Sequence, residues 1–334
     1  MPKALISRAR LQHLVEAPST AHTRIAILGD AMLDIYLRGD VDRISPEAPV
    51  PVVRVRERRQ ALGGAANVAQ NAVALGARAE LVAALGDDAS GAQLRTMLEL
   101  LGADPRGLIT TERPTTTKTR IVARGQQVVR VDEEVDSDLE GADVDALVAA
   151  VDLAISEADA LVLEDYNKGV LIESVIRRAV AAAKARGIPI VVDPKYRNFF
   201  AYTGATIFKP NRRELESALG AAVDLEHPEA LPAVLRRLGA ERLLLTLSEH
   251  GMALIEPDGS IHRIPTTARE VFDVVGAGDT VTAWLAAMLA VGATPLEAAV
   301  IANYAAGVEV GKTGAATVSP GEILGVYDAV YDVA

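Results

Sequence analysis

The chain contains the stretch Asp273-Val-Val-Gly-Ala-Gly-Asp279, and the apolar run 280–289 follows it directly. This order predicts a loop that turns into a helix, whose first backbone amides have no helical partners and point outward. Small residues allow an anion to approach such amides closely. We therefore expect Gly276, Ala277 and Gly278 to form an anion hole at the start of the helix.

Asp279 completes this stretch, and its charge would repel a bound anion. The carboxylate is useful there if it accepts a proton from a hydroxyl group while the neighbouring amides hold a phosphoryl group. Asp279 is thus the candidate catalytic base. The alternative is that Asp279 only complements the helix dipole, an effect of about 0.3–1 kcal/mol.

The composition narrows the class of protein. Half of the 334 residues are hydrophobic, which predicts a large aliphatic core in one or two α/β domains. A net charge of −11 argues against a general nucleic-acid binder, which needs a basic surface. The chain has no cysteine, so disulfides, thiol catalysis and thiolate metal sites are excluded.

The N-terminal segment 1–22 has an amphipathic pattern without the apolar core of a signal peptide. It predicts a helix that docks on the rest of the protein. No apolar run reaches the roughly 18 residues of a membrane span. We therefore expect a cytoplasmic protein that has no membrane partner.

Short apolar runs alternate with helical patterns along most of the chain. The runs predict buried parallel strands at 25–28, 160–163, 188–192, 206–208 and 243–246. Helical patterns lie between several of them, for example at 171–186 and 228–238. This alternation predicts an α/β fold with helices on both faces of a mostly parallel sheet. Ligands should then bind at the carboxyl ends of the strands.

Two regions show two-residue alternation instead, at about 36–60 and 115–132. Neither can bury a core alone, so we interpret them as one small β-sheet that projects from a single domain, 1–334, as a lid. Arg54, Arg56 and Arg58 fall on one face of this sheet. They are suited to ligand contact, to a solvated edge or to a dimer interface.

A second glycine cluster, Leu62-Gly-Gly-Ala-Ala-Asn67, also opens a helical pattern. Its glycines permit close approach of a ligand, and the Asn67 amide both donates and accepts hydrogen bonds, as a sugar hydroxyl requires. The two clusters, in this order, resemble those of the ribokinase-like (phosphofructokinase B type) sugar kinases. Asn211-Arg-Arg-Glu214 is similar to the Asn-x-x-Glu motif of that family. The resemblance implies a three-layer α/β/α fold with a β-sheet lid.

Three further stretches narrow the resemblance: 43–52, 164–170 and Asp193-Pro-Lys195. They are similar to the kinase half of the ADP-heptose pathway enzymes. That likeness implies ATP-dependent phosphorylation of D-glycero-β-D-manno-heptose 7-phosphate at O1, which gives the 1,7-bisphosphate for the lipopolysaccharide core. In many relatives a nucleotidyltransferase domain follows, whereas this chain stops at Ala334, so we expect a stand-alone kinase.

The resemblance also implies roles for individual residues. Sugar contacts are expected from Asp34, Gly63, Gly64 and Asn67, and contacts to the 7-phosphate from Lys118, Arg120, Lys168 and Lys195. Contacts to ATP are expected from Asn211, Glu214, Thr246, Ser248, Gly251 and Asn303. Relatives usually have glycine at the position of Ser248. Mg²⁺ should arrive with ATP and be held through water near Glu214, and Asp273 is a candidate ligand for K⁺.

Other functions remain open at this point. The same chemistry can serve another sugar, such as ribose or fructose 6-phosphate. A sugar-responsive regulator can keep the fold without catalysis, although a pure binder gains nothing from a carboxylate that faces phosphate. If strands of the lid pair between chains, the protein is a homodimer.

Overall fold

A computed structural model describes residues 4–268 and 271–331. Its centre is a nine-stranded sheet with the strand order β13-β12-β11-β10-β9-β8-β1-β4-β5. The strands are parallel except β12, which runs antiparallel to both of its neighbours. Their bounds are β1 Arg24–Gly29, β4 Arg78–Gly86, β5 Leu108–Thr111, β8 Ala160–Glu164, β9 Ile190–Asp193, β10 Ile207–Phe208, β11 Arg242–Thr246, β12 Met252–Ile255 and β13 Ile261–Ile264. The predicted α/β fold is confirmed.

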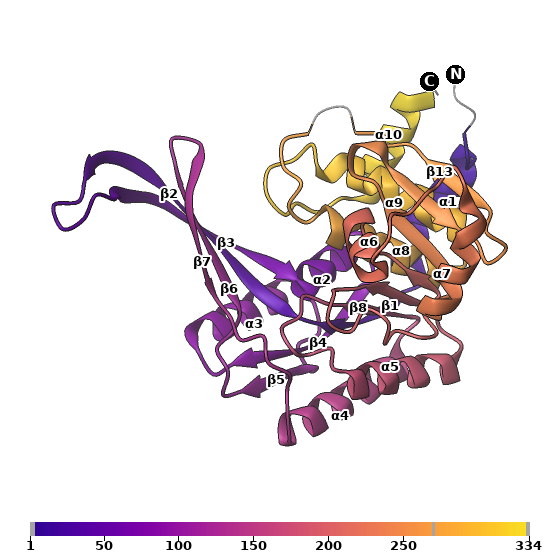
Figure 1. Ribbon diagram of the computed structural model, residues 1–334, viewed down its shortest axis with the longest axis horizontal. Coiled ribbons are helices and arrows are strands. Elements are labelled where there is room, and N and C mark those ends of the chain that lie inside the picture. Colours follow the sequence, from indigo (N-terminus) through magenta and orange to yellow (C-terminus); the bar gives the residue numbers. More distant parts are fainter. Residues whose placement is uncertain (1–3, 269–270, 332–334) are drawn as a thin grey trace.

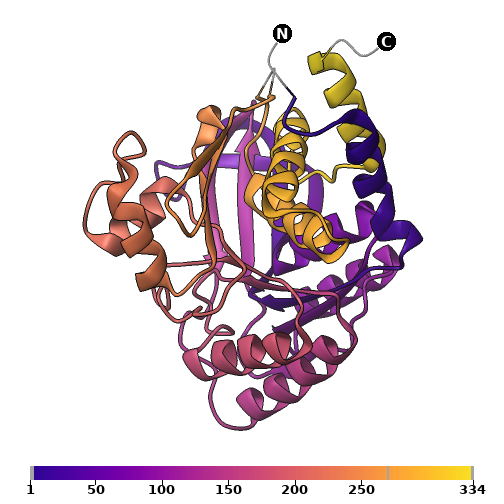
Figure 2. The ribbon, with the colours of Figure 1, turned by 90° about the vertical axis from the view of Figure 1, so that its right-hand side faces the viewer.

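Helices cover both faces of this sheet (Figures 1 and 2), and each face has its own apolar cluster. One face carries α1 Arg8–Thr20, α2 Ala65–Ala74, α3 Ala89–Leu101, α8 Ala277–Ala290, α9 Pro295–Glu309 and α10 Pro320–Tyr331. The other carries α4 Ala142–Glu157, α5 Glu173–Arg186, α6 Arg212–Leu219 and α7 Leu231–Leu238. Because both faces are covered, the central strands are apolar throughout instead of alternating.

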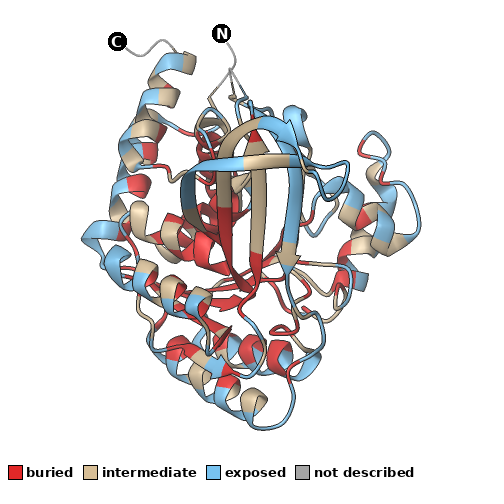
Figure 3. Ribbon diagram, turned by 90° about the vertical axis from the view of Figure 1, so that its left-hand side faces the viewer, coloured by how far each residue is buried: buried red, intermediate tan, exposed pale blue. Residues whose placement is uncertain are grey.

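A second, four-stranded sheet projects from this body (Figure 1). It consists of β2 Ala31–Ile44, β3 Pro51–Gly64, β6 Thr117–Ala123 and β7 Gln126–Glu133, in the order β3-β2-β6-β7. The bases of β2 and β3 are buried, whereas their far ends are exposed (Figure 3). Arg56 pairs with Asp40 at 2.9 Å, and Arg54 with Asp42 at 3.2 Å, so these two arginines bind lid carboxylates. We call this sheet the lid.

The N-terminal helix α1 docks on α8, α9 and α10 through its apolar side. Arg8 pairs with Asp328 of α10 at 2.6 Å, and Arg10 with Glu297 of α9 at 2.8 Å. Among the residues that the structure describes, no helix has the length and apolar character that crossing a membrane requires.

The parallel strands β1, β8 and β9 bring acidic side chains together at their carboxyl ends. Gly29 is in register with Glu164, and Glu164 with Asp193. The first turn of α8, with Asp279, lies over the same edge, because a side chain at Gly278 would come within 3.7 Å of Asp193. The candidate site lies at this edge.

Candidate active site

Asp279 lies in the first turn of α8 and is only 4% exposed. One carboxylate oxygen, Oδ1, accepts a hydrogen bond from the Tyr166 hydroxyl at 2.8 Å, and Oδ2 accepts one from the Asn67 amide at 2.7 Å. Burial raises the pKa of Asp279 to about 6, and these two hydrogen bonds oppose the rise. The group is therefore ionised at neutral pH and is basic enough to accept a proton.

A chain of buried donors fixes the amide of Asn67. An ionised carboxylate only accepts, so Asn67 must present its NH₂ to Asp279 and its oxygen to Asn71. Asn71 Nδ2 bonds that oxygen at 3.3 Å and the backbone carbonyl of Asn67 at 3.0 Å. The Thr280 hydroxyl then donates to Asn71 Oδ1 at 3.1 Å. Donation thus runs in one direction, from Thr280 through both asparagines to Asp279.

Gly276 gives the loop before α8 its shape. Its φ of 96° lies in the left-handed region that favours glycine. A Cβ there would come within 2.9 Å of Asn67 Nδ2, so any side chain would disturb the donor to Asp279. The amides that follow, at Ala277 and Gly278, belong to the first turn of α8 and have no helical carbonyl to bond, although the Ala277 N–H makes a long 3.5 Å bond to the carbonyl of Val274. This geometry suits the predicted anion hole.

A buried ion pair lies next to Gly278. Lys209 and Asp193 pair at 2.7 Å, and a Cβ at Gly278 would be 3.8 Å from the amine and 3.7 Å from the carboxylate. Burial by itself lowers the pKa of Lys209. The negative charges of Asp193 and Glu164 raise it by a larger amount, so the net shift of the pKa is upward. Burial also raises the pKa of Glu164 well above its usual range, and the charge of Asp193 adds to this rise. The sequence places Glu164 and Lys209 at the ends of predicted strands, where ligands are expected, but predicts no individual role for either residue.

Asp30 organises the loop after β8 instead of facing the cavity. Its buried carboxylate accepts backbone N–H bonds from Tyr166, Lys168 and Val170, at 2.8, 3.0 and 3.2 Å. Burial raises the pKa of Asp30 to about 6, against the effect of these bonds. The loop that carries Tyr166 is thus tied to the end of β1.

Asp279 lines a cavity of about 160 Å³, which we call the Asp279 cavity. It is lined by Met32, Asp34, Gly63, Gly64, Asn67, Lys118, Arg120, Arg130, Tyr166, Val275, Gly276, Asp279 and Ala315. Six of the eight residues predicted to bind the sugar or its phosphate are in this set. Asp34 pairs with Arg120 at 2.5 Å, and a Cβ at Gly63 would come within 2.9 Å of the same carboxylate. Gly63 therefore leaves space for the Asp34 side chain.

Lys168 and Lys195 line a second cavity of about 630 Å³, the lysine cavity, which adjoins the first at Lys118 and Tyr166. Their amines are paired: Lys168 with Glu134 at 2.8 Å, and Lys195 with Glu214. Glu134 is also 3.9 Å from Lys118.

Asn211 and Glu214 also line the lysine cavity. They form a capping box at the start of α6, in which each side chain bonds the other's backbone amide. Glu214 thus stabilises the first turn of α6, and its carboxylate also pairs with Lys195.

The remaining residues predicted for ATP surround a third cavity of about 360 Å³, the Asn303 cavity. Thr246, Ser248, Gly251 and Asn303 line it, together with Ala277 and Gly278 of the anion hole. Thr246 forms a β-bridge with Asn211, which connects this cavity to the lysine cavity. Ser248 has a φ of 54°, and this left-handed backbone explains why glycine suits its position in relatives.

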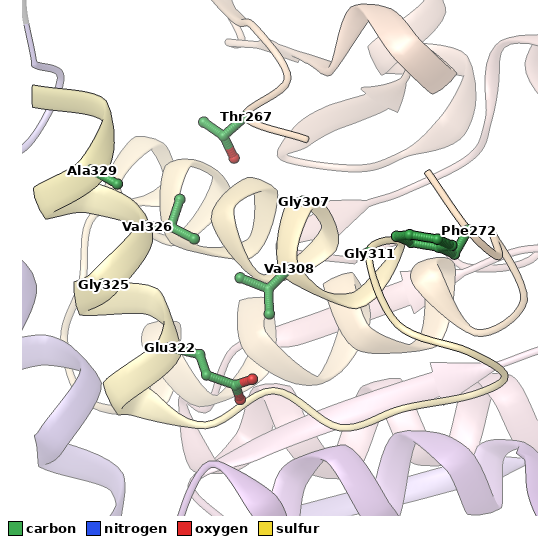
Figure 4. A pocket seen from close by; sticks show the side chains of 9 residues that line it. All are labelled: Thr267, Phe272, Gly307, Val308, Gly311, Glu322, Gly325, Val326 and Ala329. Atoms are coloured by element: carbon green, nitrogen blue, oxygen red, sulfur yellow. The ribbon is translucent and has the colours of Figure 1, made fainter. Parts of the chain in front are cut away.

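A fourth cavity, of about 520 Å³, lies between α9 and α10 (Figure 4). Most of its lining is apolar, including Phe272, Val308 and Val326. Gly307 borders both this cavity and the Asn303 cavity. None of the residues predicted for the site lines it.

Two observations bear on metal ions. Within residues 4–268 and 271–331, no three His, Asp or Glu side chains come close enough to hold a metal by themselves. Asp273, the candidate ligand for K⁺, accepts backbone N–H bonds from Val275 at 3.0 Å and from Gly314 at 3.1 Å. Its carboxylate joins the loop before α8 to the loop after α9.

Comparison with known families matches residues 22–321 to the pfkB family carbohydrate kinases. The chain belongs to this family. It is therefore a carbohydrate kinase, and the resemblance stated from the glycine clusters is confirmed.

Curated relatives agree with this assignment. The chain is 44% identical over 315 residues to the bifunctional protein HldE of Rhodospirillum rubrum, covering 92% of the chain and 62% of that protein. It is 48% identical over 304 residues to the bifunctional protein HldE of Azorhizobium caulinodans, covering 90% and 63%. The kinase thus spans less than two thirds of the length of these relatives.

Solved structures share the fold. Phosphofructokinase-2 from Escherichia coli in complex with potassium aligns with a TM-score of 0.76 at 20% identity, covering 92% of this chain and 99% of the other. Arabidopsis thaliana ribokinase complexed with ribose and ATP aligns with a TM-score of 0.71 at 21% identity, covering 91% and 98%.

Proposed function

We propose that this kinase transfers the γ-phosphoryl group of ATP to O1 of D-glycero-β-D-manno-heptose 7-phosphate. The product is the 1,7-bisphosphate, a precursor of ADP-heptose for the lipopolysaccharide core. The observation that carries the chemistry is the buried, ionised Asp279 beside the anion hole, inside a cavity lined by Lys118, Arg120 and Arg130. The choice of a heptose rests on the resemblance of 43–52 and 164–170 to the heptose phosphate kinases.

In this proposal Asp279 accepts the O1 proton as the acceptor oxygen attacks the γ-phosphorus. The amides at 276–278 stabilise the charge that develops on the equatorial phosphoryl oxygens. Asp34 binds the sugar hydroxyls. The buried pair Lys209–Asp193 places a positive charge next to Gly278, where the phosphoryl group would lie.

The distal phosphate of the acceptor needs cations. Lys118, Arg120 and Arg130 share the cavity of Asp279, so they are better placed for this role than Lys168 and Lys195, which line the lysine cavity. Arg120 and Arg130 pair with Asp34 and Asp132, so a bound phosphate would share these cations with the two carboxylates.

The Asn303 cavity would hold the adenine, and the lysine cavity the remaining phosphates beside Asn211 and Glu214. Mg²⁺ would enter with ATP and be held near Glu214 through water, since Mg²⁺ usually keeps several waters and binds with substrate phosphates. Mg²⁺ would neutralise the phosphate charge during transfer. Asp273, next to the anion hole, would take part in a K⁺ site.

A homodimer through the lid is the proposed assembly. The lid exposes Ile44, Val50, Val55, Val128, Val129 and Val131, an unusual number of apolar side chains for a projecting sheet. A second copy of the chain would cover them. Light scattering tests this, since a mass of one chain at working concentration contradicts it.

The deciding experiment is ADP release by the purified protein with Mg²⁺ and ATP. Its acceptors are D-glycero-D-manno-heptose 7-phosphate, sedoheptulose 7-phosphate, fructose 6-phosphate and ribose. Selective turnover of the manno-heptose phosphate supports the proposal. Preference for another acceptor rejects the heptose while keeping Asp279 as base. Binding of heptose phosphate without turnover of any acceptor identifies a regulator.

A further inference from the structure

Tyr166 lies where the Asp279 cavity meets the lysine cavity, and it lines both. Its hydroxyl donates to Asp279 Oδ1 at 2.8 Å. The two residues are 113 positions apart in the chain, so only the fold brings them together. The mechanism described above gives Tyr166 no role.

Tyr166 is held by three neighbours, one at its backbone and two at its ring. Its backbone N–H donates to Asp30 Oδ2 at 2.8 Å, which fixes the start of the loop. The Lys195 amine lies 5.4 Å from the ring centroid, in cation–π contact. A Cβ at Gly64 would be 3.4 Å from ring atom Cδ2, so the ring fills the space next to that glycine. The hydroxyl is thus presented to Asp279 from a fixed position.

A carboxylate turns easily about its last side-chain bond, because the energy wells of that torsion are broad. One hydrogen bond, from Asn67 to Oδ2, leaves this rotation open. A second bond, from Tyr166 to Oδ1, fixes the plane of the group. Burial raises the pKa of Tyr166 well above its usual range, so the phenol keeps its proton and remains a donor.

We propose that Tyr166 is a positioning residue for the base: its hydroxyl, with the amide of Asn67, orients the carboxylate of Asp279 toward the acceptor hydroxyl in the Asp279 cavity. This inference rests on the proposed kinase chemistry but is independent of which sugar is the acceptor. The aromatic ring has the separate role of dividing the two cavities, and phenylalanine keeps that role.

The substitution Tyr166→Phe removes only the hydroxyl. We expect kcat to fall about tenfold, the loss for one hydrogen bond to a charged group, with KM for both substrates changed less than about twofold. The acid limb of kcat/KM against pH should move upward from about 6, because the bond that is removed favours the ionised form of Asp279 and lowers its pKa in the wild-type protein. Wild-type kcat with an unmoved acid limb would overturn the inference.

The matched control is Tyr327→Phe. This substitution also removes a hydroxyl that donates a buried hydrogen bond of similar length, 2.9 Å. The acceptor of that bond is the carbonyl of Ile6, away from the site. This variant should keep wild-type kcat and the wild-type pH profile. Equal kinetic effects in both variants would show that Tyr166 acts only through stability, which also overturns the inference.

If the wild-type protein turns over no acceptor, the proposed function fails, and thermal unfolding then tests Tyr166 by itself. A bond to an ionised carboxylate is stronger than one to a neutral carboxyl. The Tm lost on Tyr166→Phe should therefore be larger at pH 8 than at pH 5, while the Tm lost on Tyr327→Phe stays constant. If the Tm lost on Tyr166→Phe is the same at pH 8 and pH 5, as it should be for Tyr327→Phe, the orienting bond is rejected.

Discussion

Charged side chains around Asp279 are buried and bonded on several sides, whereas those at the far ends of the lid strands β2 and β3 are half exposed to solvent. The side chains of Lys209 and Asp193 are 4% and 14% exposed, but those of Arg56 and Asp40 are 58% and 49% exposed. Both pairs have similar lengths, 2.7 and 2.9 Å. Length alone therefore does not determine the importance of an ion pair, since water screens the lid pair and not the buried one.

Replacement of the base should have the largest effect. We expect Asp279→Asn to lower kcat by roughly 10²–10⁴, about 3–5 kcal/mol of barrier, because the amide of asparagine cannot act as a general base. ATP affinity, measured by calorimetry, should change little. Turnover within a few-fold of the wild-type value would contradict the assignment of Asp279 as base.

Breaking the buried pair should cost stability. Lys209→Met leaves Asp193 as an uncompensated buried charge, and we expect a loss of about 3–5 kcal/mol in the free energy of unfolding. Urea unfolding can be followed through Trp284, the single tryptophan, which is fully buried on α8. Adding Asp193→Asn should recover part of this loss. A loss below about 1 kcal/mol would mean that solvent reaches the pair.

Lowering the pH should titrate the base. Catalysis needs ionised Asp279, whose pKa in the free enzyme is about 6, so kcat/KM should be constant above pH 7 and fall as the pH drops through 6. At pH 5 about one tenth of the carboxylate is ionised, and kcat/KM should be about one tenth of its plateau. Circular dichroism over the same range checks that the protein stays folded. A flat profile down to pH 5 would exclude a base with this pKa.

The basic side chains of the Asp279 cavity should affect the binding of the acceptor but not that of ATP. We expect Lys118→Met to raise KM for a phosphorylated acceptor about tenfold, the contribution of one charged contact, and to leave KM for ATP unchanged. Lys184, an exposed residue of α5, provides the control, since Lys184→Met should change neither KM. An equal rise in both KM values would place Lys118 near ATP.

The lid pair should have the smallest effect. Arg56→Ala removes an exposed ion pair, and we expect the free energy of unfolding to fall by less than about 1 kcal/mol. Steady-state kinetics should be unchanged if the arginine is only solvated. A rise in the dissociation constant of a dimer, measured by ultracentrifugation, would instead place Arg56 in the interface between chains.

Local sequence patterns were sufficient to predict the fold and the centre of the candidate site. Apolar runs and glycine clusters act over a few residues, so β1, β8, β9, β10, β11 and the loop 273–279 were predicted, whereas β4, β5, β12 and β13 were not. The pairing of Tyr166 with Asp279 and that of Lys209 with Asp193 could not be found in this way, because other elements supply the partners.

Asn67 is a second residue whose contact in the structure could not be predicted from local sequence. Its residue type suits a sugar contact, but in the structure its NH₂ group bonds Asp279, 212 positions away. The quoted motif 164–170 did contain a usable signal for Tyr166, since an aromatic hydroxyl directly after a buried strand is placed at the ligand-binding edge of the sheet.

The projecting lid has a practical consequence, because the chain has no cysteine. A cysteine introduced at exposed Glu47, in the turn between β2 and β3, and another at exposed Arg177 on α5 would be the only two thiols. Both accept spin labels without competing reactions. The distribution of distances between the labels, recorded before and after adding nucleotide and sugar phosphate, would then measure directly whether the lid moves during the catalytic cycle.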